Sequence, residues 1–270
     1  MAGRADLLRH VGRSGLDMAV RRGALVRLFP SAYADAERLG DPWLRWRAAL
    51  LYAGAGAAFS HTSALRLWRL PGAAAQPPDP REPLHLTVPV SCRRRSATGV
   101  VLHRSHRGDR VTRGGFPVTS IELAIAQSWP LASHDAQRAP LIRAVSDRAT
   151  TPDRIADVAA TLPNLPGRAG LLALNGLLAM GCRSELELWG YAHVFSGPGL
   201  PPLRWQHPVM LGRRKIYLDV YAESQRVNFE LDGARWHTSP EQRERDLRRD
   251  AALAGLGHPG RPLQPPPADP

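Results

Sequence analysis

The sequence predicts an α+β protein of two domains, on three observations. Its 270 residues suffice for about two domains of ordinary size, and 43% of them are hydrophobic, as in chains that fold around a core. Helical and extended segments occur in both halves of the chain. A hinge with proline and glycine, residues 164–167, separates the halves. We therefore expect domains at 1–165 and 180–257, with the boundary between 164 and 180.

The N-terminal segment predicts a helix followed by a short strand. Ser14 is placed to cap a helix, and Gly23 stands where a left-handed residue ends one. Residues 25–28 are apolar enough for a strand, and Pro30 lies in the turn that follows. This order is typical of a winged helix.

Two helices are expected next, over 41–58 and 60–70. Asp41 and Pro42 suit the cap and the first turn of the earlier one. His61 is expected to begin the later helix rather than to bind a metal, because no second histidine lies at ligand spacing.

A proline-rich connector, residues 71–83, leads to two apolar runs at 84–88 and 99–104. We expect these runs to form a β-hairpin with a basic tip that holds Arg93, Arg94 and Arg95. Three helices are predicted after the hairpin, over 119–128, 139–149 and 151–162.

The second half predicts the order αβββα. Ser184 and Glu187 form a capping-box pattern at the start of a helix over 184–194. Ser239, followed by proline, begins a second helix that ends near residue 256. Three strands are expected between the helices, at 204–211, 215–222 and 226–231.

Acidic residues collect on one face of these strands. Because side chains alternate along a strand, Asp219, Glu230 and Asp232 point away from the apolar face. Three neighbouring carboxylates repel one another unless a cation lies between them, and an all-oxygen set suits Mg²⁺ or Mn²⁺. The alternative is that these carboxylates lie on a solvent-exposed face and bind nothing.

This pattern resembles a known nuclease family over residues 182–257. The residues that carry the resemblance are Ser184-x-x-Glu187, Asp219, Glu230-Leu231-Asp232-Gly233, His237 and Asp246-x-x-Arg249-Asp250. They are similar to the very-short-patch-repair-like endonuclease domain, also called domain of unknown function 559, of the PD-(D/E)XK nuclease superfamily. The resemblance implies a restriction-endonuclease-like core.

The resemblance also implies roles for single residues. Asp219 and Glu230 would be the metal-binding pair, with Asp232 at the position where many of these nucleases have a lysine. His237 would be a general base or phosphate contact, or would only cap a turn. Glu187 would be a further metal ligand, a hydrogen-bond acceptor that contacts a ligand rather than the metal, or only a helix cap. Two more carboxylates lie near the site on one helix face: Asp246 and Asp250.

The N-terminal half resembles, more loosely, the winged-helix region of AbiEi-type antitoxins. The matching residues are Gly23-x-Leu25-Val26-Arg27-Leu28, Tyr33 and Ser60-His61-x-Ser63-Ala64. This resemblance implies DNA as a partner and a cognate toxin as a second one.

The charge distribution favours DNA binding by the same half. Residues 1–115 hold 19 arginines and 8 acidic residues, a net charge of +11 out of +12 for the whole chain. The alternative is a solvated basic surface, since only one of the 36 basic residues is a lysine and the composition suggests GC-rich coding. The candidate DNA contacts are Arg21, Arg22, Arg27, Arg93, Arg94 and Arg95.

Together these features predict a metal-dependent, endonuclease-like DNA-binding protein whose catalytic competence is open. The alternative is a non-catalytic, antitoxin-like DNA-binding regulator. Two cysteines, Cys92 and Cys182, and the lack of a signal or membrane segment predict a soluble protein of the cytoplasm.

The C-terminal segment departs from the nuclease pattern. Six of the thirteen residues from 258 to 270 are proline, which removes ladder donors. We expect a disordered tail, a core that lacks its last strand, and catalysis that is weakened or lost.

Overall fold

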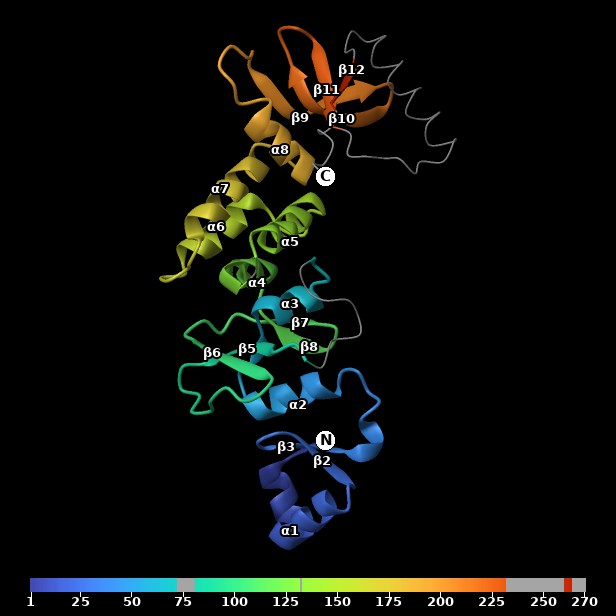
Figure 1. Ribbon diagram of the computed structural model, residues 1–270, viewed down its shortest axis with the longest axis vertical. Helices are drawn as coiled ribbons and strands as arrows, with labels where there is room; N and C mark the ends of the chain where they lie inside the picture. The colour runs from blue at the N-terminus through green and yellow to red at the C-terminus, as the bar shows by residue number, and fades with distance from the viewer. Residues whose placement is uncertain (72–80, 132, 232–259, 264–270) are drawn as a thin grey trace, which may run out of the picture. The chain divides into compact units, whose positions relative to one another are not determined.

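The computed structural model of the protein describes residues 1–71, 81–131, 133–231 and 260–263, which form an α+β fold with three β-sheets (Figure 1). Its residue contacts divide the chain into two compact units, Met1–Leu172 and Ala173–Pro270, here the first and second unit. Among the described residues, no helix is both long enough and apolar enough to cross a membrane.

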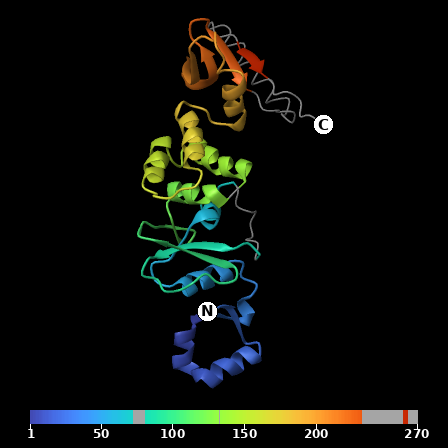
Figure 2. The ribbon, with the colours of Figure 1, turned by 60° about the vertical axis from the view of Figure 1, so that its left-hand side comes forward.

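The first sheet of the first unit packs against a bent helix. Its antiparallel strands, in spatial order, are β1 (Ala2–Gly3), β3 (Ala32–Asp35) and β2 (Leu25–Phe29). Helix α1 (Arg4–Arg21) bends at Gly12, whose φ of 67° is not helical (Figure 2). Gly23, with φ of 72°, ends the turn after the helix as expected, since glycine adopts this conformation without strain.

A five-stranded sheet forms the centre of the first unit. In spatial order its strands are β6 (Val100–Ser105), β5 (Leu84–Pro89), β4 (Ala58–Phe59), β8 (Phe116–Val118) and β7 (Val111–Arg113). Helices α2 (Leu44–Ala53) and α3 (His61–Leu67) pack on it. Trp46, Phe59 and Phe116 meet in its core, where the rings of Trp46 and Phe59 are 4.5 Å apart.

The predicted hairpin is wrong, because β5 and β6 are parallel. Arg45 of α2 donates to the carbonyl oxygens of Glu82 at 2.9 Å and Gly99 at 2.7 Å, just before the two strands begin. The guanidinium group of Arg45 therefore bridges the starts of β5 and β6. Two strands whose starts lie next to each other in a sheet run in the same direction, as these do. The basic segment is therefore part of a crossover connection.

Helices α4 and α6 lie close to their expected places, whereas α5 begins and ends earlier than expected and α7 lies where no helix was predicted. Ser120 and Thr151 cap α4 and α6 through side-chain oxygens that accept a backbone N–H, as their residue types predict. Helix α7 spans the point at which the two units divide. The helical segments are η1 (Ala36–Arg38), α4 (Ile121–Ser128), η2 (Trp129–Leu131), α5 (His134–Ser146), α6 (Pro152–Ala160) and α7 (Arg168–Ala179).

In the described part of the second unit, a helix packs on a four-stranded sheet. Helix α8 (Glu185–His193) precedes β9 (Leu203–Leu211), β10 (Arg214–Ala222), β11 (Val227–Leu231) and β12 (Gly260–Leu263), and the spatial order is β12-β11-β10-β9. Phe195, Val220 and Leu231 form a buried cluster between helix and sheet. A Cβ on Gly190 would lie 3.3 Å from Leu231, so glycine allows a close approach of α8.

The expectation of a core without its last strand is wrong. Residues Gly260–Leu263 form β12, which pairs in parallel with β11 in the register Glu230↔Pro262. β12 ends the spatial order of the described strands, and proline is compatible with an edge strand because only one side of such a strand needs ladder donors. The other expected tail residues, 258–259 and 264–270, lie outside the described residues.

Candidate metal centre

The carboxylate of Glu187 is held by the start of α8. The hydroxyl of Ser184 accepts the Glu187 backbone N–H at 3.1 Å and donates to Oε1 at 3.0 Å. The backbone N–H of Arg183 donates to Oε2 at 3.0 Å. The Ser184 cap is thus confirmed, although the Glu187 carboxylate accepts the N–H of Arg183 rather than that of Ser184; Glu187 is only 6% exposed, so its carboxylate is also a buried charge.

Asp219 lies on β10 at the end of its described pairing with β11. The pairs run from Ala222↔Val227 to Val220↔Phe229, and one more step would place Asp219 opposite Glu230. Instead, the Leu231 backbone N–H donates to Asp219 Oδ2 at 3.0 Å. The side chain of Asp219 therefore takes the place of a ladder acceptor, and this fixes one of its oxygens.

Gln206 of β9 joins the two carboxylates. Its Nε2 donates to Glu187 Oε2 at 3.3 Å and to Asp219 Oδ1 at 3.1 Å. Gln206 has a φ of 49°, in the left-handed region, and the β9–β10 pairing is interrupted there, between the pairs of His207 and Trp205. A non-glycine residue in this conformation is strained, and such strain concentrates at functional sites.

Charge repulsion acts on this pair. Burial raises the pKa of Glu187, and the negative charge of Asp219 raises it further. The hydrogen bonds from Ser184, Arg183 and Gln206 oppose this rise. The neutral amide of Gln206 therefore lies between two carboxylates and donates a hydrogen bond to each.

Glu230 lies at the next position of the same pairing, and its carboxylate is oriented by Asn228. The amide of Asn228 donates to Glu230 Oε1 at 2.5 Å. Asn228 is fully buried, and its Oδ1 has no hydrogen-bond partner among the described residues. Glu187 and Asp219 thus share the Gln206 amide, whereas Glu230 is held by Asn228.

Four of the predicted site residues are not placed. Asp232, His237, Asp246 and Asp250 lie outside the described residues, as does the helix expected from residue 239. Of the three strand carboxylates predicted to converge, the structure describes only Asp219 and Glu230, one step beyond the described β10–β11 pairs, so their convergence stays a prediction. The structure shows that the carboxylates of Glu187 and Asp219 bind the same Gln206 amide. The sequence had suggested a place beside the metal ligands for Glu187 only as one of three roles.

The predicted polar face of β10 is wrong in one respect. Strand alternation places Tyr221 on the same face as Asp219, yet Tyr221 is 4% exposed and packs against Leu218. The ring of His207 stacks on Tyr221 with centroids 4.8 Å apart. Val220 and Tyr221 are adjacent and both buried, so β10 is covered on both faces at this point and alternation does not mark a solvent side.

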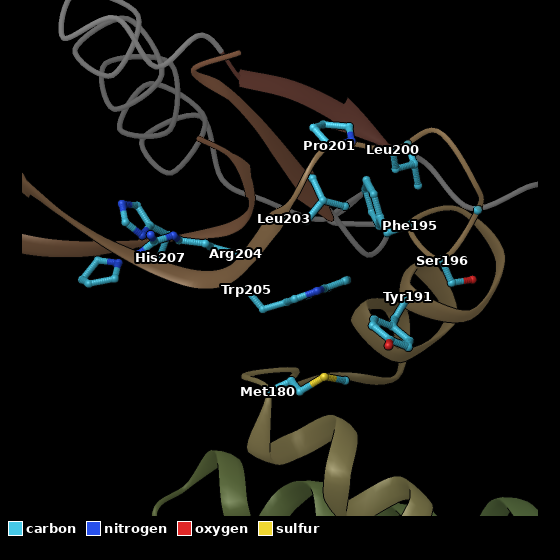
Figure 3. A pocket seen from close by; sticks show the side chains of 12 residues that line it. Met180, Tyr191, Phe195, Ser196, Leu200, Pro201, Leu203, Arg204, Trp205 and His207 are labelled. Atoms are coloured by element: carbon cyan, nitrogen blue, oxygen red, sulfur yellow. The ribbon is translucent and has the colours of Figure 1, made fainter. Parts of the chain in front are cut away.

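A cavity of about 700 Å³ lies beside β9 (Figure 3). Tyr191, Phe195 and Trp205 line it, together with Arg204 and His207. Phe195 and Trp205 also belong to the buried cluster that packs α8 on the sheet. Neither Glu187 nor Asp219 lines this cavity, so it is separate from the candidate metal centre.

The candidate DNA contacts lie in the first unit, and all six are exposed: Arg21, Arg22, Arg27, Arg93, Arg94 and Arg95. Arg94 also has a structural role, because it donates to Ser31 Oγ at 2.7 Å and lies 5.6 Å above the ring of Tyr52. Substitutions that test DNA binding should therefore leave Arg94 in place.

His61 begins α3 as predicted, but histidines distant in sequence lie beside it in the structure. The structure brings His61, His85 and His103 together in the first unit. Their sequence separations of 24 and 18 residues match no metal-binding motif. Only the pairing of β5 with β4 and β6 brings them together, so local sequence gave no signal.

The geometry thus defines an α+β protein with a carboxylate centre in its second unit. A scan against protein-family models and a search of curated proteins found no match. Among solved structures, the chain is similar to a crystal structure of the Rv2827c protein from Mycobacterium tuberculosis, with 19% identity and a TM-score of 0.46, covering 65% of this chain and 72% of that one. This degree of similarity carries no argument about function.

Proposed function

We propose that the second unit hydrolyses phosphodiester bonds in DNA with a divalent cation held by Glu187 and Asp219, and that Glu230 completes the oxygen set. The observation that supports this most strongly is the amide of Gln206, which donates to both carboxylates from a strained backbone. The resemblance to very-short-patch-repair-like endonucleases of the PD-(D/E)XK superfamily, which rests on the same residues, agrees with it.

The residues of the centre have separate tasks. The Leu231 N–H holds one oxygen of Asp219, so its other oxygen and the carboxylate of Glu187 face the amide of Gln206. Asn228 orients Glu230. When bound, Mg²⁺ or Mn²⁺ would polarise the phosphate and lower the pKa of an attacking water. In this proposal His237 accepts a proton or contacts the phosphate, Asp232 joins the ligands, and Asp246 and Asp250 lie near them.

The pairing of β12 with β11 bears on catalytic competence. We expected catalysis to be weak because the last strand was thought to be missing, and that reason no longer holds. β11 carries Glu230 and the Leu231 N–H that binds Asp219, so a strand paired with β11 supports both. We therefore propose an active enzyme.

Cleavage of supercoiled plasmid by the full chain tests this function. Nicked or linear product is expected with Mg²⁺ or Mn²⁺ and is expected to disappear with EDTA. Ca²⁺ is a useful comparison, because it binds oxygen ligands but has a looser geometry. Intact plasmid in Mg²⁺ and in Mn²⁺, at protein concentrations that retard DNA, would instead favour the non-catalytic alternative.

The alternative is an antitoxin-like DNA-binding regulator with a cognate toxin as partner. The exposed arginines of the first unit and the resemblance to AbiEi-type antitoxins favour it. DNA binding by the first unit is common to both proposals, so it is tested separately from cleavage.

The double variant Arg93→Ala/Arg95→Ala is expected to weaken binding to duplex DNA. Each arginine that neutralises a phosphate contributes about 1 to the slope of log affinity against log salt, so the slope should fall by about 2. Fluorescence anisotropy with Asp219→Asn protein measures this without cleavage. Arg143→Ala removes an exposed arginine of α5 and is the control. Equal salt slopes for all three proteins would exclude this arginine segment from the DNA interface.

A further inference from the structure

Three histidines from separate segments of the first unit have converging ring nitrogens. His61 begins α3, His85 lies on β5 and His103 on β6. One ring nitrogen of each lies within 4.8 Å of the others, and His85 Nδ1 is 3.0 Å from His103 Nε2. The rings of His61 and His103 stack with centroids 3.7 Å apart.

Backbone pairing fixes this convergence. The parallel register of β5 and β6 sets His103 opposite Thr87, and His85 lies two residues before Thr87, on the same face. The Ser60 N–H donates to the His85 carbonyl at 3.0 Å, and the His85 N–H donates to Ser63 Oγ at 2.9 Å. The segment that begins α3 is thus joined to β5 at the level of the histidines.

His61 is held in an unusual conformation. Its φ of 51° is in the left-handed region. This backbone conformation is strained for residues other than glycine and persists only where the surrounding structure holds it. Its Nδ1 lies 2.9 Å from Ser60 Oγ, so the other ring nitrogen, Nε2, is left for the cluster. A hydrogen bond to the second ring nitrogen is how proteins orient histidine ligands of metals.

Burial favours the neutral form of the three rings. His61 is 8% exposed and His85 9%, and His103 is half-buried. Burial and the neighbouring histidines lower the pKa of His61 to about 2 and that of His103 to about 4, and burial also lowers the pKa of His85. Neutral imidazoles have a lone pair to offer a metal ion.

Thr87 provides a second, independent observation. Its hydroxyl is buried and has no hydrogen-bond partner among the described residues. Buried hydroxyls are normally bonded, so an unpartnered one calls for a ligand or a water. Thr87 shares its strand face with His85 and lies opposite His103, which places this unpartnered group beside the three rings.

We infer that His61, His85 and His103 form a binding site for Zn²⁺ or a similar borderline-soft divalent ion, with a water or the Thr87 hydroxyl in the fourth position. Three imidazoles and one oxygen are a common tetrahedral zinc set. Ligand nitrogens of such a site are about 3.3 Å apart, from bonds of about 2.05 Å at tetrahedral angles. The 3.0 Å separation of the His85 and His103 nitrogens already approaches this value.

Binding requires the rings to turn. Their planes differ by only 17° to 30°, so they stack rather than point at one centre. The torsion that turns a histidine ring has a broad minimum, and rotation exchanges the His85–His103 hydrogen bond for two metal bonds. The bound ion would link α3, β5 and β6, and so stabilise the first unit. Nitrogen ligands disfavour Mg²⁺, so this site is distinct from the carboxylate centre.

Titration of the full chain with Co²⁺ tests the site, since a tetrahedral cobalt ion absorbs visible light strongly. The Asp219→Asn protein is used so that the carboxylate pair does not compete for the ion. One equivalent is expected to bind. His103→Gln should weaken Co²⁺ binding at least tenfold, whereas His106→Gln, which changes an exposed histidine three residues further on, should leave it unchanged.

Thermal unfolding with and without Zn²⁺ gives a second readout, because a ligand of the folded state raises its melting temperature. Zn²⁺ should raise the melting temperature of the parent and of His106→Gln, but not that of His103→Gln. If His103→Gln is unfolded without metal, His61→Asn is used in its place. Equal Co²⁺ affinity in parent and variant, or no effect of Zn²⁺ on the parent, would overturn the proposal and would leave the proposed nuclease function untouched.

Discussion

Replacing Asp219 with asparagine is expected to lower metal-dependent DNA cleavage by about 10²- to 10³-fold. The cation contributes several kcal/mol of transition-state stabilisation, and each 1.36 kcal/mol corresponds to a factor of about ten in rate. Asparagine keeps an oxygen that can accept the Leu231 N–H but removes the negative charge. The fold is therefore expected to persist while the site loses a charged ligand.

Glu223→Gln is the matched control for this variant. Glu223 follows β10 closely in sequence but is exposed, and it forms a surface ion pair with Arg204 at 2.7 Å. Its loss should change neither cleavage nor stability appreciably, since exposed pairs contribute little. Initial rates of plasmid nicking, measured with circular dichroism of each protein, provide the comparison. Equal rates for Asp219→Asn and the wild type would exclude Asp219 from the centre.

Glu187→Gln is expected to separate activity from stability. Cleavage should fall by about 10²-fold through the loss of a ligand charge. Stability without metal should rise, because burial and Asp219 both act against the charged form of Glu187. Glutamine fits the same hydrogen bonds: its oxygen accepts from Arg183 and Gln206, and its amide group faces Ser184, whose hydroxyl can turn to accept.

The pH dependence of stability follows from the same residue. The pKa of Glu187 is raised in the folded state. Between the ordinary glutamate pKa and this raised value, the folded protein binds more protons than the unfolded one, so stability falls as pH rises. In EDTA, Glu187→Gln should remove this fall. Urea denaturation at several pH values measures it, and identical profiles for both proteins would show that Glu187 carries no buried-charge penalty.

Local sequence patterns correctly predicted those caps and turns that depend only on neighbouring residues. The Ser184 cap, the turn at Gly23 and the start of α6 at Thr151 each depend on residues within one helical turn, and each is found. The three strands of the second unit were expected close to their observed ends for the same reason.

The predictions from local sequence patterns failed where the structure depends on contacts between residues that are distant in sequence. The parallel direction of β6 involves contacts such as that of Arg45, which lies 54 residues before Gly99. Alternation could not identify Tyr221 as buried, because both faces of β10 are covered at that point. Proline content argued against β12, yet an edge strand tolerates proline.

The candidate site was predicted only in part for the same reason. Strand alternation singled out Asp219 and Glu230 as candidate site residues. The link between Asp219 and Glu187, however, is made by the side chain of Gln206, which lies on a third element, β9. Glu187 also belongs to the helix cap of α8. This local role alone explains a glutamate at that position, so the sequence does not point to its contact with Gln206. The three histidines share no spacing that a sequence motif would reveal.

Calorimetric titration with Mn²⁺ tests the central proposal most directly, because it measures the ion at the carboxylate pair without DNA or catalysis. The full chain with His103→Gln is used, so that the histidine cluster does not contribute. We expect a site that is lost in Asp219→Asn, weakened at least tenfold in Glu187→Gln and unchanged in Glu223→Gln. Identical Mn²⁺ titrations for the parent and Asp219→Asn would contradict the proposal.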